Sequence, residues 1–221
     1  MDLSTFTPAS ALITVILLAL APFVAVMITS FTKLVVVLSL LRNAMGLQQV
    51  PPNVVMNGLA LVLSIYVMYP VGLEMQERLS AMPATKVASA STSQMVAAAD
   101  VAKEPLREFL IKHSRPLERA FFLKTAQRSL KPEQAQALSE RDFLVIVPAF
   151  TVSELTVAFE IGFLIFLPFL VIDLVISNIL MAMGMQMLSP TTVSLPFKLL
   201  LFVLIDGWVK LTHGLVLTYQ T

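Results

Sequence analysis

Residues 148–208 read PAFTVSELTVAFEIGFLIFLPFLVIDLVISNILMAMGMQMLSPTTVSLPFKLLLFVLIDGW, and this stretch decides the fold of the chain. It is apolar enough for a membrane, yet its apolar runs contain five ionisable residues: Glu154, Glu160, Asp173, Lys198 and Asp206. One ionisable side chain at the centre of a bilayer costs about 2.5 kcal/mol or more. We therefore expect these side chains to face protein or water, and the stretch to be buried in an assembly.

The composition of the 221-residue chain also indicates membrane association. Hydrophobic residues make up 57% of the chain and charged residues only 13%, whereas soluble domains are about 25% charged. The net charge of +1 argues against a nucleic-acid partner, which would require a basic surface. The chain has no cysteine, which excludes disulfides, thiolate metal sites and cysteine nucleophiles.

Charged residues are concentrated in the middle of the chain, where 20 of the 29 lie between Glu74 and Asp142. This distribution predicts an N-terminal hydrophobic helical hairpin at residues 1–73 and a polar helical domain with an Ala/Ser-rich linker at 74–142. A C-terminal hydrophobic helical hairpin with a Met-rich turn follows at 143–221. The expected fold class is all-α: long kinked helical hairpins with a small helical domain inserted between them, in a membrane-associated oligomeric assembly.

The N-terminal hairpin begins with an apolar run at residues 12–28, long enough to cross a bilayer. We interpret it as a retained segment because the residues before it are acidic, unlike the basic start of a signal peptide. Pro22 is expected to kink or divide this helix. Lys33 then lies between two apolar pieces, either as an interfacial lysine that reaches water or in a buried or intersubunit ion pair, which we favour.

Turn signals separate the remaining helices of the first two regions. Gly46 and Pro51–Pro52 predict the end of one helix and the start of another, which runs back over residues 54–73. Helical spacing predicts two amphipathic helices separated near Arg115–Pro116, and a third short helix that begins at Pro132.

The polar middle region shows no catalytic pattern. His113 is its only histidine, and no Gly-rich phosphate loop accompanies it. We expect a solvated or cap-like histidine there. His213 also lies outside any nucleophile–base arrangement, so the sequence predicts neither an enzyme nor a cofactor or metal site.

The charge-free runs of the second hairpin, residues 161–172 and 174–187, are too short to cross a bilayer separately. Two alternatives remain: a long, broken helix whose charges face protein, or a helical hairpin held partly or wholly above the membrane by its partners. If all four apolar segments span, the middle region lies on the same side as both termini.

Several motifs in this order closely resemble the R-type export-gate subunit of type III secretion systems, the SctR/FliP family. They are TSFTKLVVVLSLLRNAMGLQQVPPN at residues 29–53, PAFTVSEL and AFEIGF at 148–163, LPFLVIDLVIS at 167–177, MAMGMQMLSP at 181–190 and LPFKLLLFVLIDGW at 195–208. The resemblance covers nearly the whole chain outside the middle region. The sequence MGMQML at residues 183–188 is more similar to the injectisome branch, associated with virulence, than to the flagellar branch.

The resemblance implies a non-enzymatic subunit of a helical channel for unfolded proteins at the bacterial inner membrane, within the secretion basal body. In this family several copies, five in the known architecture, assemble with S-type and T-type subunits. U-type switch and V-type export proteins lie on the cytoplasmic side, and inner rod and needle proteins join above. The central domain is placed in the periplasm, and no cofactor is implied.

The resemblance also assigns roles to residues. Met183, Met185 and Met187 match the family's methionine gasket, which closes the pore, and Gln186 interrupts that run here. Unbranched, polarizable methionines can close against ions and deform around a passing chain. The ionisable residues Lys33, Glu154, Glu160, Asp173, Lys198 and Asp206 become candidate buried or intersubunit charges; we predict that Glu154, Glu160 or Asp173 pairs with Lys33 or Lys198.

One alternative function remains at this stage. A multi-pass secondary transporter also uses intramembrane Glu, Asp and Lys residues and broken helices. The two halves of the chain show no inverted repeat, which argues against it.

Overall fold

The computed structural model of the chain describes residues 8–47, 49–81, 101–185 and 187–220, and all regular structure in these ranges is helical. The predicted all-α fold class is confirmed. The predicted breaks at Arg115–Pro116 and Pro132 coincide with the starts of two helices. The helices are α1 (Pro8–Met27), α2 (Phe31–Ala44), α3 (Asn53–Ser80), α6 (Glu104–Lys112), α7 (Pro116–Ser129), α8 (Pro132–Ala137), α9 (Phe143–Ala182), α10 (Pro190–Leu204) and α11 (Gly207–Leu217).

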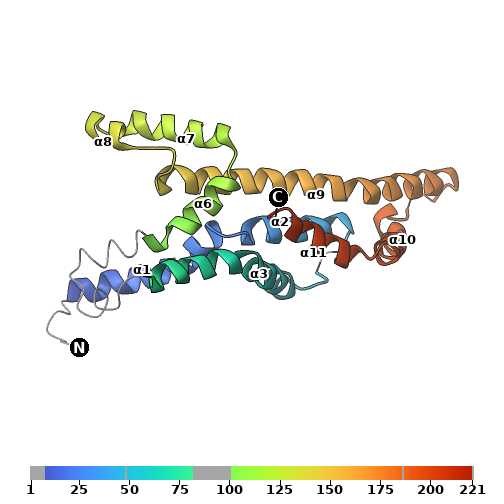
Figure 1. Cartoon of the computed structure of the whole chain (residues 1–221). Coiled ribbons are helices and arrows are strands. Elements are labelled where there is room, and N and C mark those ends of the chain that lie inside the picture. Colours follow the sequence, from blue (N-terminus) through green and yellow to red (C-terminus); the bar gives the residue numbers. More distant parts are fainter. Residues whose placement is uncertain (1–7, 48, 82–100, 186, 221) are drawn as a thin grey trace.

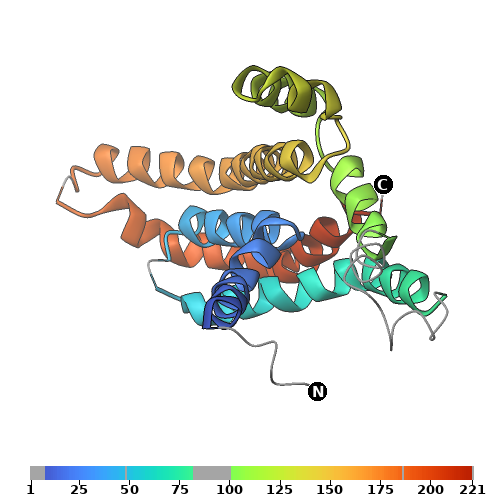
Figure 2. The same ribbon diagram turned by 90° about the vertical axis from the view of Figure 1, so that its left-hand side faces the viewer.

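Helix α9 organises the molecule (Figure 1). Its 40 residues extend about 60 Å at 1.5 Å per residue. Helix α2 packs along α9, α3 packs against α2, and α10 returns along α9 on the same side. Figure 2 shows α7 and α8 on the opposite side of α9 from these helices. The two hydrophobic hairpins are thus packed together as one body.

Charges interrupt the hydropathy of α9 without interrupting the helix. It continues through Pro148, Pro168 and Asp173, so the two short charge-free runs belong largely to one element. Glu154 is buried against protein, and Asp173 accepts a hydrogen bond from Ser194 of α10. Helix α9 is thus continuous where the first alternative expected a broken helix, and the choice between the two alternatives stays a prediction.

The break in the N-terminal apolar segment lies after Pro22. Helix α1 includes Pro22 and ends at Met27, and the chain bends by 65° before α2 begins. Of the two effects predicted for Pro22, division of the helix does not occur, and a kink stays a prediction. The Thr32 side chain donates to the Val26 carbonyl at 2.9 Å, which satisfies one of the last carbonyls of α1 where the chain turns.

Helix α2 ends at a glycine, as the turn signals predict. Gly46 has φ +76°, and its N–H donates to Asn43 O while the N–H of Leu47 donates to Arg42 O. This pair of bonds satisfies the last carbonyls of α2 and reverses the chain. Pro52 then precedes α3 as its N-cap residue.

The polar middle region shares its core with the hairpins. Phe109 and Leu110 of α6 pack with Ile146 and Phe150 of α9 and with Tyr219 near the C-terminus. Helices α7 and α8 contain no buried residue. The middle region therefore shares a core with the hairpins through α6, while α7 packs on the outside of α9 without burying a residue.

Large apolar side chains remain exposed along the long helices. Helices α3 and α9 are each long and apolar enough to cross a membrane, and the described residues give up to four spans if the bent pairs α1–α2 and α10–α11 each count as one. On α3 and α9, exposed examples are Leu61, Tyr66, Tyr69, Phe163 and Leu164. Such surfaces require lipid or other subunits to cover them.

Gly162 allows α9 to approach α2 closely, because a Cβ atom there would overlap the Leu40 side chain. We expect Gly162→Val to lower the free energy of unfolding by about 1–3 kcal/mol, the usual effect of overpacking a close contact. The measurement is thermal unfolding of the purified protein in detergent. Gly58→Val is the control, since a Cβ at Gly58 of α3 meets no atom within 4 Å; equal losses from both variants would contradict the assignment.

Candidate functional site

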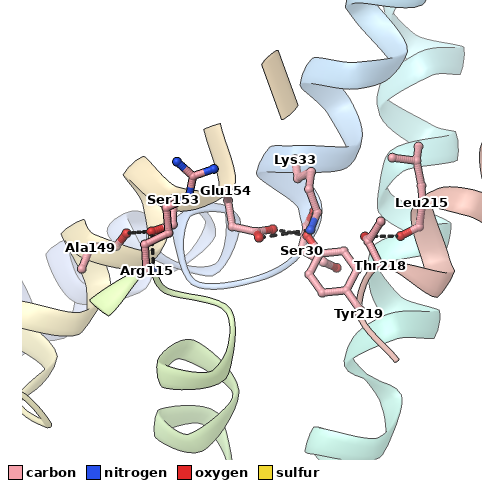
Figure 3. A network of polar contacts seen from close by, with 9 residues as sticks. All are labelled: Ser30, Lys33, Arg115, Ala149, Ser153, Glu154, Leu215, Thr218 and Tyr219. Carbon is pink, nitrogen blue, oxygen red and sulfur yellow. Dashed lines mark hydrogen bonds and ion pairs between the residues drawn. The ribbon is translucent and has the colours of Figure 1, made fainter. Parts of the chain in front are cut away.

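The centre of the molecule contains a buried ion pair between α2 and α9 (Figure 3). Lys33 Nζ donates to Glu154 Oε1 at 3.1 Å, and the two side chains are only 3% and 2% exposed. The pair joins residues that are 121 positions apart in the sequence. Their attraction offsets part of the cost of removing both charges from water.

Tyr219 completes the environment of this pair. Its hydroxyl donates to Glu154 Oε2 and lies 3.4 Å from the Ser30 carbonyl, and its ring lies under Lys33 Nζ at 3.7 Å from the ring centre. The Ser30 hydroxyl donates to Ser64 Oγ of α3 at 3.1 Å. The network therefore ties α2, α3, α9 and the C-terminal residues together.

His113 brings the polar middle region into contact with the network. It is the C-cap residue of α6, and its ring lies 4.7 Å from the Phe109 ring and 5.0 Å from the Tyr219 ring. Burial, with smaller contributions from the charges of Lys33 and Lys112, lowers the pKa of His113 to about 4. The expected cap position is thus observed, but the histidine is partly enclosed and is not a freely solvated one.

A second ion pair joins α9 and α10. Lys198 Nζ lies 2.6 Å from Asp173 Oδ2 and donates to the Ala44 carbonyl at 3.2 Å. The Ser194 hydroxyl also donates to Asp173, at 2.5 Å. Lys198 is 2% exposed and Asp173 is 29% exposed, so this pair lies at the edge of the protein interior. It connects the C-terminal hairpin to the end of α2.

The structure separates the six candidate charges into two groups. Lys33 with Glu154, and Lys198 with Asp173, pair within one chain. Glu160 does not meet either lysine and instead pairs with Arg115 at 2.7 Å, where the side chains are 57% and 44% exposed. Asp206 is exposed in the break between α10 and α11, with φ +53°. An intersubunit role for these two residues stays a prediction.

The Met-rich turn forms the tip of the C-terminal hairpin. Gly184 has φ +71°; its N–H donates to Met181 O, and the N–H of Met185 donates to Leu180 O. This arrangement ends α9 in a defined reversal, and Pro190 then occupies the first turn of α10. The methionine side chains are exposed by 60% at position 183, 41% at 185 and 100% at 187. Gln186 lies outside the described residues.

The sequence interpretation did not identify Tyr219, Ser30 or Arg115 as members of these sites. Tyr219 follows an apolar helix near the end of the chain, and neither periodicity nor a motif indicates that its hydroxyl reaches Glu154. In the described residues, no three His, Asp or Glu side chains lie close enough to hold a metal ion. The arrangement supports a role of these residues in packing the helices together.

Comparison with known proteins gives matches along almost the entire chain. Residues 13–215 match the FliP family. Over 209 residues the chain is 54% identical to "Pathogenicity-related ORF2" of Xanthomonas campestris pv. glycines, covering 95% of each protein. It is 50% identical over 216 residues to "Hypersensitivity response secretion protein HrcR" of Ralstonia nicotianae, covering 96% of this chain and 97% of that protein. It is 54% identical over 203 residues to "Yop proteins translocation protein R" of Yersinia pestis, covering 92% of each.

We expect Lys33→Ala to destabilise the fold by about 3–5 kcal/mol, because it leaves the Glu154 carboxylate buried without its partner. Unfolding followed by circular dichroism in detergent measures this loss.

The double variant Lys33→Met with Glu154→Leu should lose less stability than Lys33→Ala, since no lone charge remains. Arg115→Ala, which breaks the exposed pair with Glu160, is the control and should cost less than about 1 kcal/mol. A loss of similar size in Lys33→Ala and Arg115→Ala would contradict the interpretation.

His113 should make stability depend on pH. The unfolded chain binds a proton at His113 near pH 6.5, whereas the folded chain binds it only near pH 4. This contribution to the unfolding free energy is therefore complete above about pH 6.5 and decreases as the pH falls toward 4. His113→Gln should flatten the difference in melting temperature between pH 7.5 and 4.5, and the exposed His213→Gln should not. The same change of melting temperature with pH in the unchanged protein and in both variants would refute this assignment.

Proposed function

The chain belongs to the FliP family, and from this premise we propose that it is the R-type core subunit of an injectisome type III export gate. Several copies, five in the architecture that the resemblance implies, surround a channel through which unfolded proteins pass the bacterial inner membrane. It is a non-enzymatic protein of type III secretion. The whole-length match to relatives named for secretion and translocation supports this role for the entire chain.

The observation that carries the proposal of a gate is the exposed Met-rich turn. Met183, Met185 and Met187 project from the tip of a hairpin whose backbone is held by the hydrogen bonds around Gly184. Apolar side chains this exposed require a partner or a dewetted space. A ring of such tips, one from each copy, would form an apolar constriction that excludes ions and widens around a passing polypeptide.

The wider assembly follows from the same premise. We propose that S-type and T-type subunits complete the channel, that U-type switch and V-type export proteins bind below it, and that inner rod and needle proteins join above. The middle region would face the periplasm, within the secretion basal body. Exposed apolar surface on α3 and α9 supports contact with lipid or neighbouring subunits.

The secondary-transporter alternative receives less support. Lys33 with Glu154, and Lys198 with Asp173, pair within the chain. A groove of about 640 Å³ between α9 and α11 is lined almost entirely by apolar residues. Coupling ions would instead need a polar site between the helices.

Replacing Met185 and Met187 with alanine should increase ion leak through the closed gate several-fold, because shorter side chains leave the constriction open to water. The measurement is the conductance of the purified export-gate complex in planar lipid bilayers. Met27→Ala removes an exposed methionine at the end of α1, away from the turn, and serves as the control. Unchanged conductance in the double variant would remove these methionines from the constriction.

A further inference from the structure

Helix α7 turns one side of its surface away from the rest of the molecule. Figure 2 shows this helix on the outside of α9. Its outward positions follow one another by about one helical turn, and at about 100° per residue they point within about 60° of each other. They are Leu117, Phe121, Lys124 and Arg128, all exposed, which we term the α7 stripe. Half-buried positions of the helix point roughly the opposite way: 119, 122, 123 and 126.

The N-terminal half of the α7 stripe is apolar. Leu117 is 77% exposed and Phe121 is 59% exposed. The Phe122 ring meets the Phe121 ring edge-on, with 5.3 Å between the ring centres, so the Phe121 ring is supported on one side and uncovered on the other. A supported aromatic side chain loses little freedom when a partner covers it, which favours binding at this end.

The C-terminal half of the α7 stripe is cationic. Lys124 and Arg128 lie on it, Lys131 follows at the start of α8, and all three side chains are exposed. None of these three forms an ion pair with the described residues. Arg115 and Arg119, at the other end of the helix, are instead bonded to groups of their own chain. Unpaired cations in one row create a positive field that attracts a row of anions.

The orientation of α7 argues against a bilayer as the partner of this row. The Arg115 N–H donates to Ser153 Oγ of α9 at 2.9 Å, which fixes the start of α7 beside that residue. Figure 1 shows α7 running back from there toward the start of α9. The charge-free runs of α9 begin at residue 161, so a bilayer around them would lie beyond the apolar end of the stripe and away from its cations. A protein partner can lie along the whole stripe.

From this arrangement we propose that the α7 stripe docks a helix of another protein, one with an apolar side chain followed, a turn apart, by acidic side chains. The stripe extends about 17 Å, or three helical turns. The apolar side chain would cover Phe121 while the carboxylates meet Lys124 and Arg128, so the two surfaces are complementary in both respects. Glu118, the one carboxylate of α7, points about 100° away from Leu117 and does not interrupt the row.

Peptide binding tests the charge part of the proposal. The probe is a labelled helical peptide with leucine and glutamate side chains a turn apart along one face, and the matched peptide has glutamine in place of glutamate. Each peptide is titrated with the purified full chain in neutral detergent and followed by fluorescence anisotropy. The glutamate peptide should bind about tenfold more tightly at low salt, and high salt should remove the difference.

Charge reversal identifies the surface that the peptide uses. Lys124→Glu with Arg128→Glu should abolish the preference for the glutamate peptide. The matched control, Lys112→Glu with Lys210→Glu, makes the same change in net charge at exposed lysines of α6 and α11 and should keep the preference. Equal preference in both double variants, or no preference in the unchanged chain, overturns the proposal.

Photo-cross-linking in the assembled secretion apparatus tests the partner. The variant Phe121→p-benzoylphenylalanine is irradiated, and the linked peptide is sequenced by mass spectrometry. We expect an adduct with a helix of another protein that carries carboxylates a turn apart, and Lys124→Glu with Arg128→Glu should lower its yield about tenfold. Changing those carboxylates to lysine in the charge-reversed background should restore the adduct. An adduct with lipid only, an adduct with a second copy of this chain, or a yield unaffected by charge reversal overturns the proposal.

The inference goes beyond the proposed gate, because it involves neither the Met-rich turn nor a contact between copies of this chain. The ion leak of the variant with Met185 and Met187 replaced reports on the gate alone. A leak without the adduct at Phe121 would overturn only the docking proposal, and the adduct without a leak would overturn only the gate.

Discussion

The fold depends on one buried ion pair, that between Lys33 and Glu154. Neither charge is tolerated alone at 2–3% exposure, so α2 and α9 must meet in one register for the interior to form. Tyr219 adds its hydroxyl to Glu154 and its ring to Lys33, which also fixes the end of the chain. Helices from both hydrophobic halves are therefore joined by this ion pair as well as by the apolar packing of α2 against α9.

The buried charges pair within the chain, whereas its outer faces are apolar. With Lys33, Glu154, Lys198 and Asp173 matched inside one chain, the packed hairpins can behave as a unit before assembly. Their outer faces nevertheless remain apolar along α3 and α9. In the proposed assembly, covering this apolar surface would drive association.

Helix positions and the two basic partners, Lys33 and Lys198, could be predicted from the sequence, but which acidic residue meets which lysine could not. Pro116 and Pro132 mark helix starts because a proline suits a first turn, and Gly46 marks an end because it adopts positive φ. Pro22 lies inside α1 and does not divide it; the break comes at residues 28–30, between α1 and α2. The contact between Tyr219 and Glu154 depends on packing across 65 residues, which no local pattern contains.

The spacing along α9 between its two ion pairs and the Met-rich turn bears on the proposed gate. About 29 residues, or roughly 44 Å of helix, separate Glu154 from Met183, and Asp173 with Lys198 holds the hairpin about 15 Å from the turn. The position of the tip is therefore set by helices that are joined through ion pairs. The methionine side chains at the tip pack little against their own chain, as Met187 shows with full exposure. In the proposed gate, such a closure would yield through side-chain rotation while the helices that carry it stay in place.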